Sequence, residues 1–159
     1  MKLLANGIEI HYELAGTESA PVVRFSHSLL ANLAMWDPQM DSFDNYRVLR
    51  FDTRGHGQSE ATPGAYDFEL LADDAKALFD VPGIRKTHFA GLSMGGMIGQ
   101  ELALKYPERL ESLIFVRHAR LPNRRRKETR HGSADRSGNP PITIRRGYAT
   151  ISLMFMVNR

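Results

Sequence analysis

The sequence contains no cysteine, which excludes disulfide bonds, catalysis by a thiolate and metal sites with cysteine ligands. It also has no run that approaches the roughly 18 apolar residues of a membrane-spanning helix. The first residues, 1–7, are interrupted by polar side chains too early to form a secretory signal peptide. The lack of a membrane-spanning run and of a signal peptide predicts a soluble, cytoplasmic protein without a membrane partner.

Acidic residues are nearly absent from the last part of the chain. Residues 1–116 carry ten basic and sixteen acidic side chains, a net charge of −6. Residues 117–159 carry eleven basic side chains against Glu128 and Asp135 alone, a net charge of +9. The overall charge of +3 therefore combines an acidic body with a basic segment. We expect one globular domain in residues 1–116 and a basic, irregular tail over residues 117–159.

One pattern organises the acidic body, a glycine-rich turn around Ser93. Residues 91–95 (GLSMG) fit the motif G-x-S-x-G, in which a serine occupies a strained turn between a buried strand and a helix. The short, largely apolar run 87–90 before the motif is typical of a buried parallel strand. Apolar residues at helical spacing over 97–104 predict a helix that ends at Tyr106, just before a proline.

Several further strands are predicted from short runs rich in apolar and β-branched residues. The dipeptide Asn6-Gly7 predicts a two-residue turn in a hairpin over residues 2–14, with His11 on the polar face of that hairpin. Other runs of this kind lie at residues 22–25, 46–51 and 113–116.

Two helical segments are predicted before the serine motif. Apolar residues between Leu33 and Met40 indicate an irregular or short helical cover, broken at Pro38, with Trp36 in the core. A second helix begins at Asp67 or Asp73 and ends at residues 82–83 (PG), because one apolar stripe joins Leu70, Leu71, Ala75, Leu78 and Phe79.

Strands that alternate with helices favour an α/β fold, with a mostly parallel sheet and helices on both faces. Ligands bind such sheets at the carboxyl ends of the strands, where His27, Asp52 and Ser93 follow three of the predicted strands. We therefore expect the chemistry to gather at this edge. The glycine-rich loop at residues 52–59 lacks the pattern of a phosphate-binding loop, so that interpretation is not favoured.

These segments together resemble the α/β-hydrolase family, and within it the 3-oxoadipate enol-lactonases and their haloperoxidase-like esterase neighbours. The resemblance covers residues 1–116 and rests on four segments in the family's order, which are 26–29 (SHSL), 35–36 (MW), 51–59 (FDTRGHGQS) and 91–96 (GLSMGG). It implies an α/β-hydrolase fold truncated after about the sixth strand. It also implies hydrolysis of a small carboxylic ester or lactone, such as an enol-lactone of aromatic catabolism, without a metal or an organic cofactor.

The resemblance also assigns roles to individual positions. It makes Ser93 the nucleophile that becomes acylated, and it makes the backbone N–H groups of Leu29 and Met94 the oxyanion hole. By the same resemblance, Asp52 and His56 shape the loop at residues 52–59. His27 lies near the oxyanion hole and is expected to orient its loop rather than to transfer protons.

The catalytic acid and histidine of the family, which follow the serine along the chain, have no identifiable counterpart. The only acidic residues beyond the helix of Ser93 are Glu108, Glu111, Glu128 and Asp135, and the only histidines there are His118 and His131. None of these has the family's sequence context, so the acid and the base stay unassigned. Since a serine hydroxyl without a base is a poor nucleophile, we expect impaired activity, or a non-catalytic fragment as the alternative.

The basic segment allows several interpretations. The abrupt change after Val116 suggests a stretch read in another frame than an ancestral hydrolase gene. Alternatively, residues 117–146 bind nucleic acid or an acidic surface through charge alone, although no recognised motif supports this. A complementing chain, or self-association, is a third hypothesis for the source of the missing strands, acid and histidine. The apolar residues 151–157 either pack on the open sheet edge or stay disordered.

Overall fold

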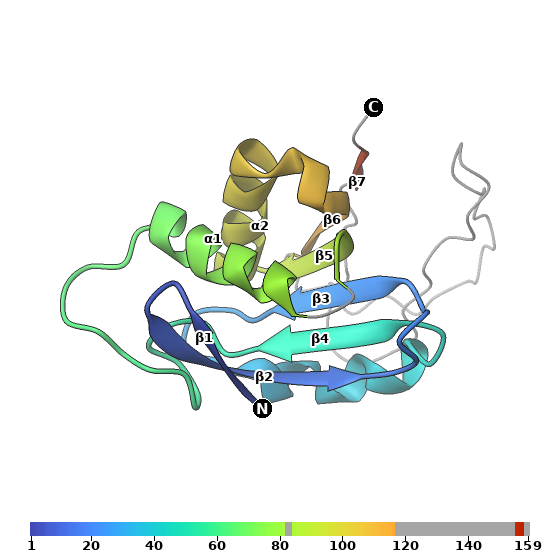
Figure 1. The fold of residues 1–159 in the computed structure, drawn as a ribbon, viewed down its shortest axis with the longest axis horizontal. Coiled ribbons are helices and arrows are strands. Elements are labelled where there is room, and N and C mark those ends of the chain that lie inside the picture. Colours follow the sequence, from blue (N-terminus) through green and yellow to red (C-terminus); the bar gives the residue numbers. More distant parts are fainter. Residues whose placement is uncertain (82–83, 117–154, 158–159) are drawn as a thin grey trace, which may run out of the picture.

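The computed structural model describes residues 1–81 and 84–116, and only the backbone of residues 155–157. A seven-stranded sheet with the order β1-β2-β4-β3-β5-β6-β7 forms its centre (Figure 1). The strands are β1 (Lys2–Ala5), β2 (Ile8–Ala15), β3 (Val22–Ser26), β4 (Arg47–Phe51), β5 (Thr87–Leu92), β6 (Leu110–Val116) and β7 (Phe155–Val157). Neighbours among β4, β3, β5 and β6 run parallel, which confirms the predicted α/β class.

The outer strands pair antiparallel with their neighbours. The turn between β1 and β2 places Asn6 at φ 48° and Gly7 at φ 80°, the two left-handed positions of a type I′ turn, so the predicted hairpin is confirmed. Six strands lie within residues 1–116, as expected. The backbone of β7 pairs with β6 at residues 112–114, so this part of the apolar segment 151–157 lies on the sheet edge.

The helices α1 (Phe68–Ala77) and α2 (Met94–Lys105) lie side by side on one face of the sheet (Figure 1). The helix α1 is followed by the short 3-10 helix η2 (Leu78–Asp80), and α2 by η3 (Pro107–Arg109). Asp67 is the residue that begins α1, because its carboxylate accepts a hydrogen bond of 2.8 Å from the N–H of Leu70. The predicted end at residues 82–83 lies outside the described part of the chain.

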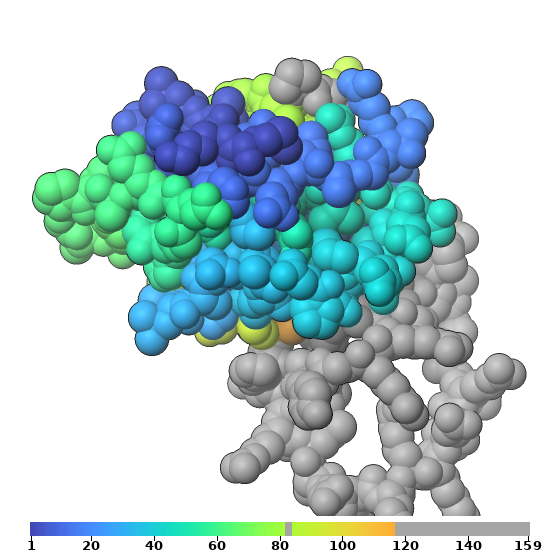
Figure 2. Space-filling view, turned by 90° about the horizontal axis from the view of Figure 1, so that it is seen from below, coloured from blue at the N-terminus to red at the C-terminus, as the bar shows by residue number. Residues whose placement is uncertain are grey.

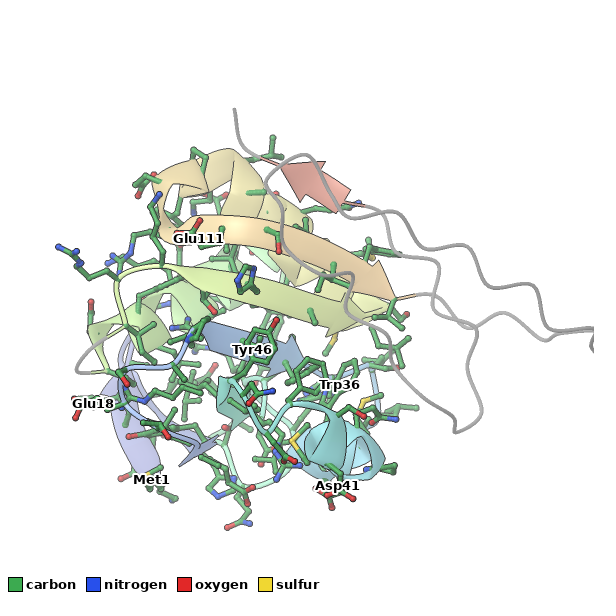
Figure 3. The ribbon with its side chains drawn as sticks, turned by 90° about the vertical axis from the view of Figure 1, so that its right-hand side faces the viewer. Met1, Glu18, Trp36, Asp41, Tyr46 and Glu111 are labelled. Atoms are coloured by element: carbon green, nitrogen blue, oxygen red, sulfur yellow. The ribbon has the colours of Figure 1, made fainter. Side chains whose placement is uncertain are left out.

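The opposite face of the sheet is covered by η1 (Leu33–Ser42), a 3-10 helix that contains Pro38. Trp36 points from η1 toward the sheet (Figure 3), and its ring centroid lies 4.7 Å from that of Phe25 in β3. The prediction that Trp36 belongs to the core is therefore confirmed. Figure 2 shows the outer side of this region, with the hairpin in dark blue beside the lighter blue segment that contains η1.

The predicted position of His11 on the polar face of the hairpin is wrong, since its side chain is buried. The loop at residues 52–60 covers this side of β2 and replaces solvent as its hydrogen-bond partner. The N–H of His11 donates to Oγ of Ser59 at 2.9 Å, and the carbonyl of Glu9 accepts from the N–H of Glu60 at 2.9 Å. Alternation within a strand identifies the two faces, but it does not show which distant loop covers one of them.

Candidate active site

The turn around Ser93 joins the end of β5 to the start of α2 in a strained conformation. Ser93 has φ 52° and ψ −111°, a region of backbone space that residues other than glycine rarely occupy. Its N–H donates to the carbonyl of Val116 at 3.2 Å, and its carbonyl accepts from the N–H groups of Gly96 and Met97 at 2.9 and 3.1 Å. These bonds hold the turn from both sides, while Ser93 itself is exposed.

Two glycines allow the backbones at this turn to approach one another. A Cβ on Gly91 would lie 2.2 Å from the carbonyl group of Gly95, and a Cβ on Gly95 would lie 2.3 Å from the carbonyl oxygen of Ser26. Both distances are too short for any side chain, and the obstructing atoms belong to the backbone. The glycines of the motif therefore bring β5, α2 and the end of β3 together.

The loop that follows β3 lies against the start of α2. The Cβ position of Gly95 is 2.8 Å from the carbonyl oxygen of His27, so the two predicted oxyanion-hole residues, Leu29 and Met94, sit at the same edge of the sheet. Within residues 1–81 and 84–116, neither the N–H of Leu29 nor that of Met94 donates a hydrogen bond. The N–H of Met94 is also the first of α2, where the helix dipole favours negative charge.

The loop over residues 27–33, here termed the oxyanion loop, is itself shaped by short-range bonds. Leu30 adopts φ 60°, and the N–H of Ala31 donates to the carbonyl of Ser28 at 3.2 Å. Leu30 is 92% exposed and Leu29 is 60% exposed. The loop thus presents apolar surface and a free N–H beside Ser93.

His27 is fully buried, and both of its ring nitrogens have partners. The Nδ1–H group donates to the carbonyl of Ser28 at 2.8 Å, and Nε2 accepts from the N–H of Thr53 at 2.9 Å. Burial is the main cause that lowers the pKa of His27, and the nearby ring of His56 lowers it further. A neutral imidazole with both nitrogens engaged orients the loop, as the sequence predicted, and has no free nitrogen with which to accept a proton from serine.

Asp52 organises the loop at residues 52–59 through its buried carboxylate. Oδ1 accepts from the N–H of Leu33 at 2.8 Å, and Oδ2 accepts from the N–H of Gln58 at 2.9 Å and from Nδ1 of His11 at 2.9 Å. The expectation that Asp52 shapes this loop is confirmed. No sequence pattern indicated that His11 is a partner of Asp52, because 41 residues separate the two.

His56 lies in the same loop and is half-buried. Its Nδ1–H group donates to the carbonyl of Arg54 at 3.0 Å, and its ring centroid lies 5.1 Å from that of His27. These contacts agree with the predicted role in shaping the loop.

A catalytic acid and base for Ser93 are not found in the described part of the chain. Glu111 lies near the amino end of β6 and Glu108 lies in η3, so the length of the strand separates them from the edge that carries Ser93. Oγ of Ser93 has no hydrogen-bond partner among residues 1–81 and 84–116. The remaining candidates, which are Glu128, Asp135, His118 and His131, lie outside the described residues.

Two features are absent from the described segments, a cluster of metal-binding side chains and a membrane-spanning helix. These segments contain no group of three or more His, Asp or Glu side chains that could hold a metal ion. In the same segments, no helix is long and apolar enough to cross a membrane.

The sequence and the structure are similar to those of known hydrolases. A family model described as alpha/beta hydrolase fold matches residues 21–132. The chain is 41% identical over 118 residues to 3-oxoadipate enol-lactonase 2 of Acinetobacter baylyi, covering 74% of this chain and 44% of that protein. It is 37% identical to a putative carbamate hydrolase RutD of Stutzerimonas stutzeri, with 72% of this chain and 44% of that protein covered.

Among solved structures, the enol-lactonase from Burkholderia xenovorans is similar at a TM-score of 0.67 and 43% sequence identity. That match covers 70% of this chain and 44% of the enol-lactonase chain. The chain thus spans less than half the length of the relatives that it matches. The residues matched by the family model include the serine turn and both loops described above.

Proposed function

Because the chain belongs to the α/β-hydrolase family, we propose that Ser93 is the nucleophile of a serine hydrolase site for small carboxylic esters or lactones. The observation that carries the proposal is the exposed Ser93 at φ 52°, next to the free N–H groups of Met94 and Leu29. A strained turn of this kind persists only where the surrounding structure enforces it, and such strain is concentrated at functional sites.

The proposed reaction begins with attack by Oγ of Ser93 on the carbonyl carbon of the substrate. The carbonyl oxygen gains a negative charge in the transition state, and the N–H groups of Met94 and Leu29 donate to it. One such donor typically contributes about 3 kcal/mol. The hydroxyl proton of Ser93 passes to water or to an added base. The bond between the carbonyl carbon and the leaving oxygen then breaks, the leaving oxygen takes up a proton from water, and water hydrolyses the ester that remains on Ser93. In an enol-lactone the leaving oxygen is that of an enolate, and it stays tethered to the acyl group until this hydrolysis releases both.

The names of the relatives support the proposed substrate class. Their names specify an enol-lactone in one case and a carbamate in another, and both substrates present a carbonyl carbon to a nucleophile. Acyl transfer through serine uses neither a metal nor an organic cofactor. We therefore propose an enol-lactone of aromatic catabolism as the substrate type. We also propose that the protein acts in the cytoplasm.

We propose that turnover by this chain is impaired. The proton of Ser93 has no acceptor in the described residues, and a serine site without its base retains only about 10³ to 10⁴-fold acceleration over water, from its oxyanion hole and binding. An added base is expected to restore part of the activity, because it can accept the proton of Ser93. A second chain that contributes an acid and a histidine would have the same effect.

The test is labelling of the purified 159-residue chain with a fluorophosphonate, with and without imidazole. We expect slow labelling that imidazole accelerates and that Ser93→Ala abolishes, because imidazole can accept the proton of the hydroxyl. Ser19→Ala is the matched control, since Ser19 is also exposed but lies in the loop before β3. Folded protein that stays unlabelled in imidazole would contradict the proposal, and labelling equal in Ser93→Ala would assign the reactivity to another residue.

A further inference from the structure

We propose that Asp52 and Thr53 form a two-point clamp that positions the oxyanion loop, and that His11 fixes the carboxylate of Asp52 for this task. The inference rests on the proposed function, because the loop carries the N–H of Leu29 that is assigned to the oxyanion hole. All three are positioning residues, since they act through the loop and do not contact the reacting atoms.

The two ends of the oxyanion loop are bound by two adjacent residues. At one end, Nε2 of His27 accepts from the N–H of Thr53 at 2.9 Å. At the other end, the N–H of Leu33 donates to Oδ1 of Asp52 at 2.8 Å. Both donors and acceptors are buried, so water does not compete for these bonds. Fixing both ends sets the path of the residues between them, including the left-handed Leu30.

His11 restricts rotation of the Asp52 carboxylate through a contact with Oδ2. Its Nδ1 lies 2.9 Å from Oδ2, and the side chain of His11 is only 11% exposed. The backbones of the two residues are joined as well, because the N–H of Asp52 donates to the carbonyl of His11 at 2.9 Å. Rotation of the carboxylate would break the bonds to His11 and Gln58, so Oδ1 stays directed at the N–H of Leu33.

A second buried carboxylate, Asp74, provides the comparison that separates positioning from stability. Asp74 is as buried as Asp52, and its side chain also bonds to the loop at residues 52–59, through Arg54. Its other partner is the side chain of Asn6 in the β1–β2 turn. Asp74 makes no bond to the oxyanion loop, whereas Asp52 does.

The experiment compares Asp52→Asn with Asp74→Asn in the full chain. An amide offers one acceptor oxygen where a carboxylate offers two, so Asp52→Asn satisfies either Leu33 or Gln58, but not both. Fluorophosphonate labelling at several concentrations separates reagent binding from the first-order reaction of Ser93. We expect Asp52→Asn to lower the first-order constant about tenfold, the rate equivalent of losing one hydrogen bond to a charged group. Reagent binding should be unchanged, and Asp74→Asn should lower the first-order constant less than twofold.

A second readout does not depend on the reactivity of Ser93. Amide hydrogen exchange of a peptide that covers residues 27–35 should accelerate about tenfold in Asp52→Asn, and should match the wild type in Asp74→Asn. Equal labelling and equal exchange in the two variants would overturn the clamp. If the wild type is not labelled at all, the proposed function fails, but the exchange comparison still decides whether the clamp exists.

The role of His11 is tested by replacing it with a shorter donor. The amide nitrogen of Asn can occupy the place of Nδ1, so His11→Asn should keep labelling within about twofold of the wild type, whereas His11→Ala should lower it about as much as Asp52→Asn does. Equal losses in His11→Asn and His11→Ala would show that the ring is needed for packing and not as a donor to Asp52, which would remove His11 from the clamp.

Discussion

Two hydrogen-bond networks connect the loop at residues 52–59 to different parts of the molecule. In the first, Asp52 and Thr53 bond to the oxyanion loop, and the groups that they meet there are a backbone N–H and an imidazole nitrogen. In the second, the guanidinium of Arg54 binds Asp74 of α1 through two bonds of 2.7 Å, and Asn6 of the hairpin joins the same carboxylate. Consecutive residues therefore serve different parts of the molecule.

The two networks differ in the consequence of removing one hydrogen-bond partner. The Arg54–Asp74 pair is a buried, bidentate ion pair, and removing one partner leaves a buried charge without compensation. Hydrogen bonding to Asp74 also raises the pKa of Arg54, so the guanidinium stays charged at every pH of interest. The network of Asp52 consists of single bonds that each fix one position. The network of Asp52 and Thr53 thus sets the geometry beside Ser93, whereas the network of Arg54 and Asp74 stabilises the framework.

The largest effect on stability is expected in the framework network, which consists of Arg54, Asp74 and Asn6. Asp74→Ala should lower the free energy of unfolding by about 3 to 5 kcal/mol, because Arg54 remains buried and charged. Urea unfolding followed by circular dichroism measures this change. Glu69→Ala is the control from the same helix, since Glu69 is an exposed carboxylate paired with Lys105, and surface pairs contribute little. Equal losses of unfolding free energy in the two variants would show that the buried Arg54–Asp74 pair contributes no more to stability than a surface pair.

A change at Gly95 acts on the site side with a smaller effect on stability. Gly95→Ala places a methyl group within 2.3 Å of the carbonyl oxygen of Ser26, so either the oxyanion loop or α2 must move. We expect a loss of about 1 to 3 kcal/mol, typical of overpacking, together with a loss of fluorophosphonate labelling in the protein that remains folded.

Gly99→Ala is the control for Gly95→Ala. It lies in the same helix, but the atoms nearest to its Cβ position belong to the side chains of Leu113 and Phe89, which can shift. It should therefore keep labelling. Labelling that survives in Gly95→Ala would mean that the oxyanion loop tolerates displacement, and would weaken the distinction between the two networks.

The pH dependence of stability tests the site side at His27. Burial lowers the pKa of His27 below its ordinary value of 6.5, so the unfolded chain binds this proton more readily than the folded chain does. The contribution of His27 to stability is therefore complete above pH 6.5 and is lost as the pH falls from there through the lowered pKa. Each such group contributes a slope of at most about 1.4 kcal/mol per pH unit.

His88 separates the two regions in this pH experiment. Burial lowers its pKa too, but its ring bonds to Ser112 at 2.9 Å near the amino ends of β5 and β6, away from Ser93. In urea unfolding between pH 7.5 and 5, His88→Gln should reduce the loss of stability. Labelling of Ser93 should also fall over this pH range, because a protonated His27 can no longer accept from the N–H of Thr53. His88→Gln should leave this fall in labelling unchanged. A fall in labelling that disappears in His88→Gln would contradict this assignment.

Local sequence patterns predicted the elements in which neighbouring residues determine the geometry. The turn at Asn6-Gly7, the helix start at Asp67 and the glycine-rich turn around Ser93 each depend on residues within a few positions of one another. The α/β class followed from their order along the chain. These predictions are confirmed. They could be made from the sequence because the physical cause of each feature lies in neighbouring residues.

The buried polar partners were not predicted, because their causes are long-range. Asp74 lies within the apolar stripe of α1 and is explained by Arg54, 20 residues away, and by Asn6, 68 residues away. Arg24 lies in the middle of β3, where it donates to the carbonyls of Ala75 and Leu78, and burial lowers its pKa to about 9. A charged residue inside an apolar run does signal a buried partner, but the sequence does not say which residue that partner is.

The smallest expected effect lies at the hairpin end of the framework network. Asn6→Gly keeps the left-handed turn, because glycine also accepts φ 48°, but it removes the 2.8 Å bond from Nδ2 to Asp74. Since Arg54 still pairs with that carboxylate, we expect a loss of about 1 kcal/mol in urea unfolding. Labelling of Ser93 should be unchanged. A loss as large as that of Asp74→Ala would instead mean that Asn6 is needed to hold Asp74 in place for Arg54, so that hairpin, loop and α1 stabilise one another as a single unit.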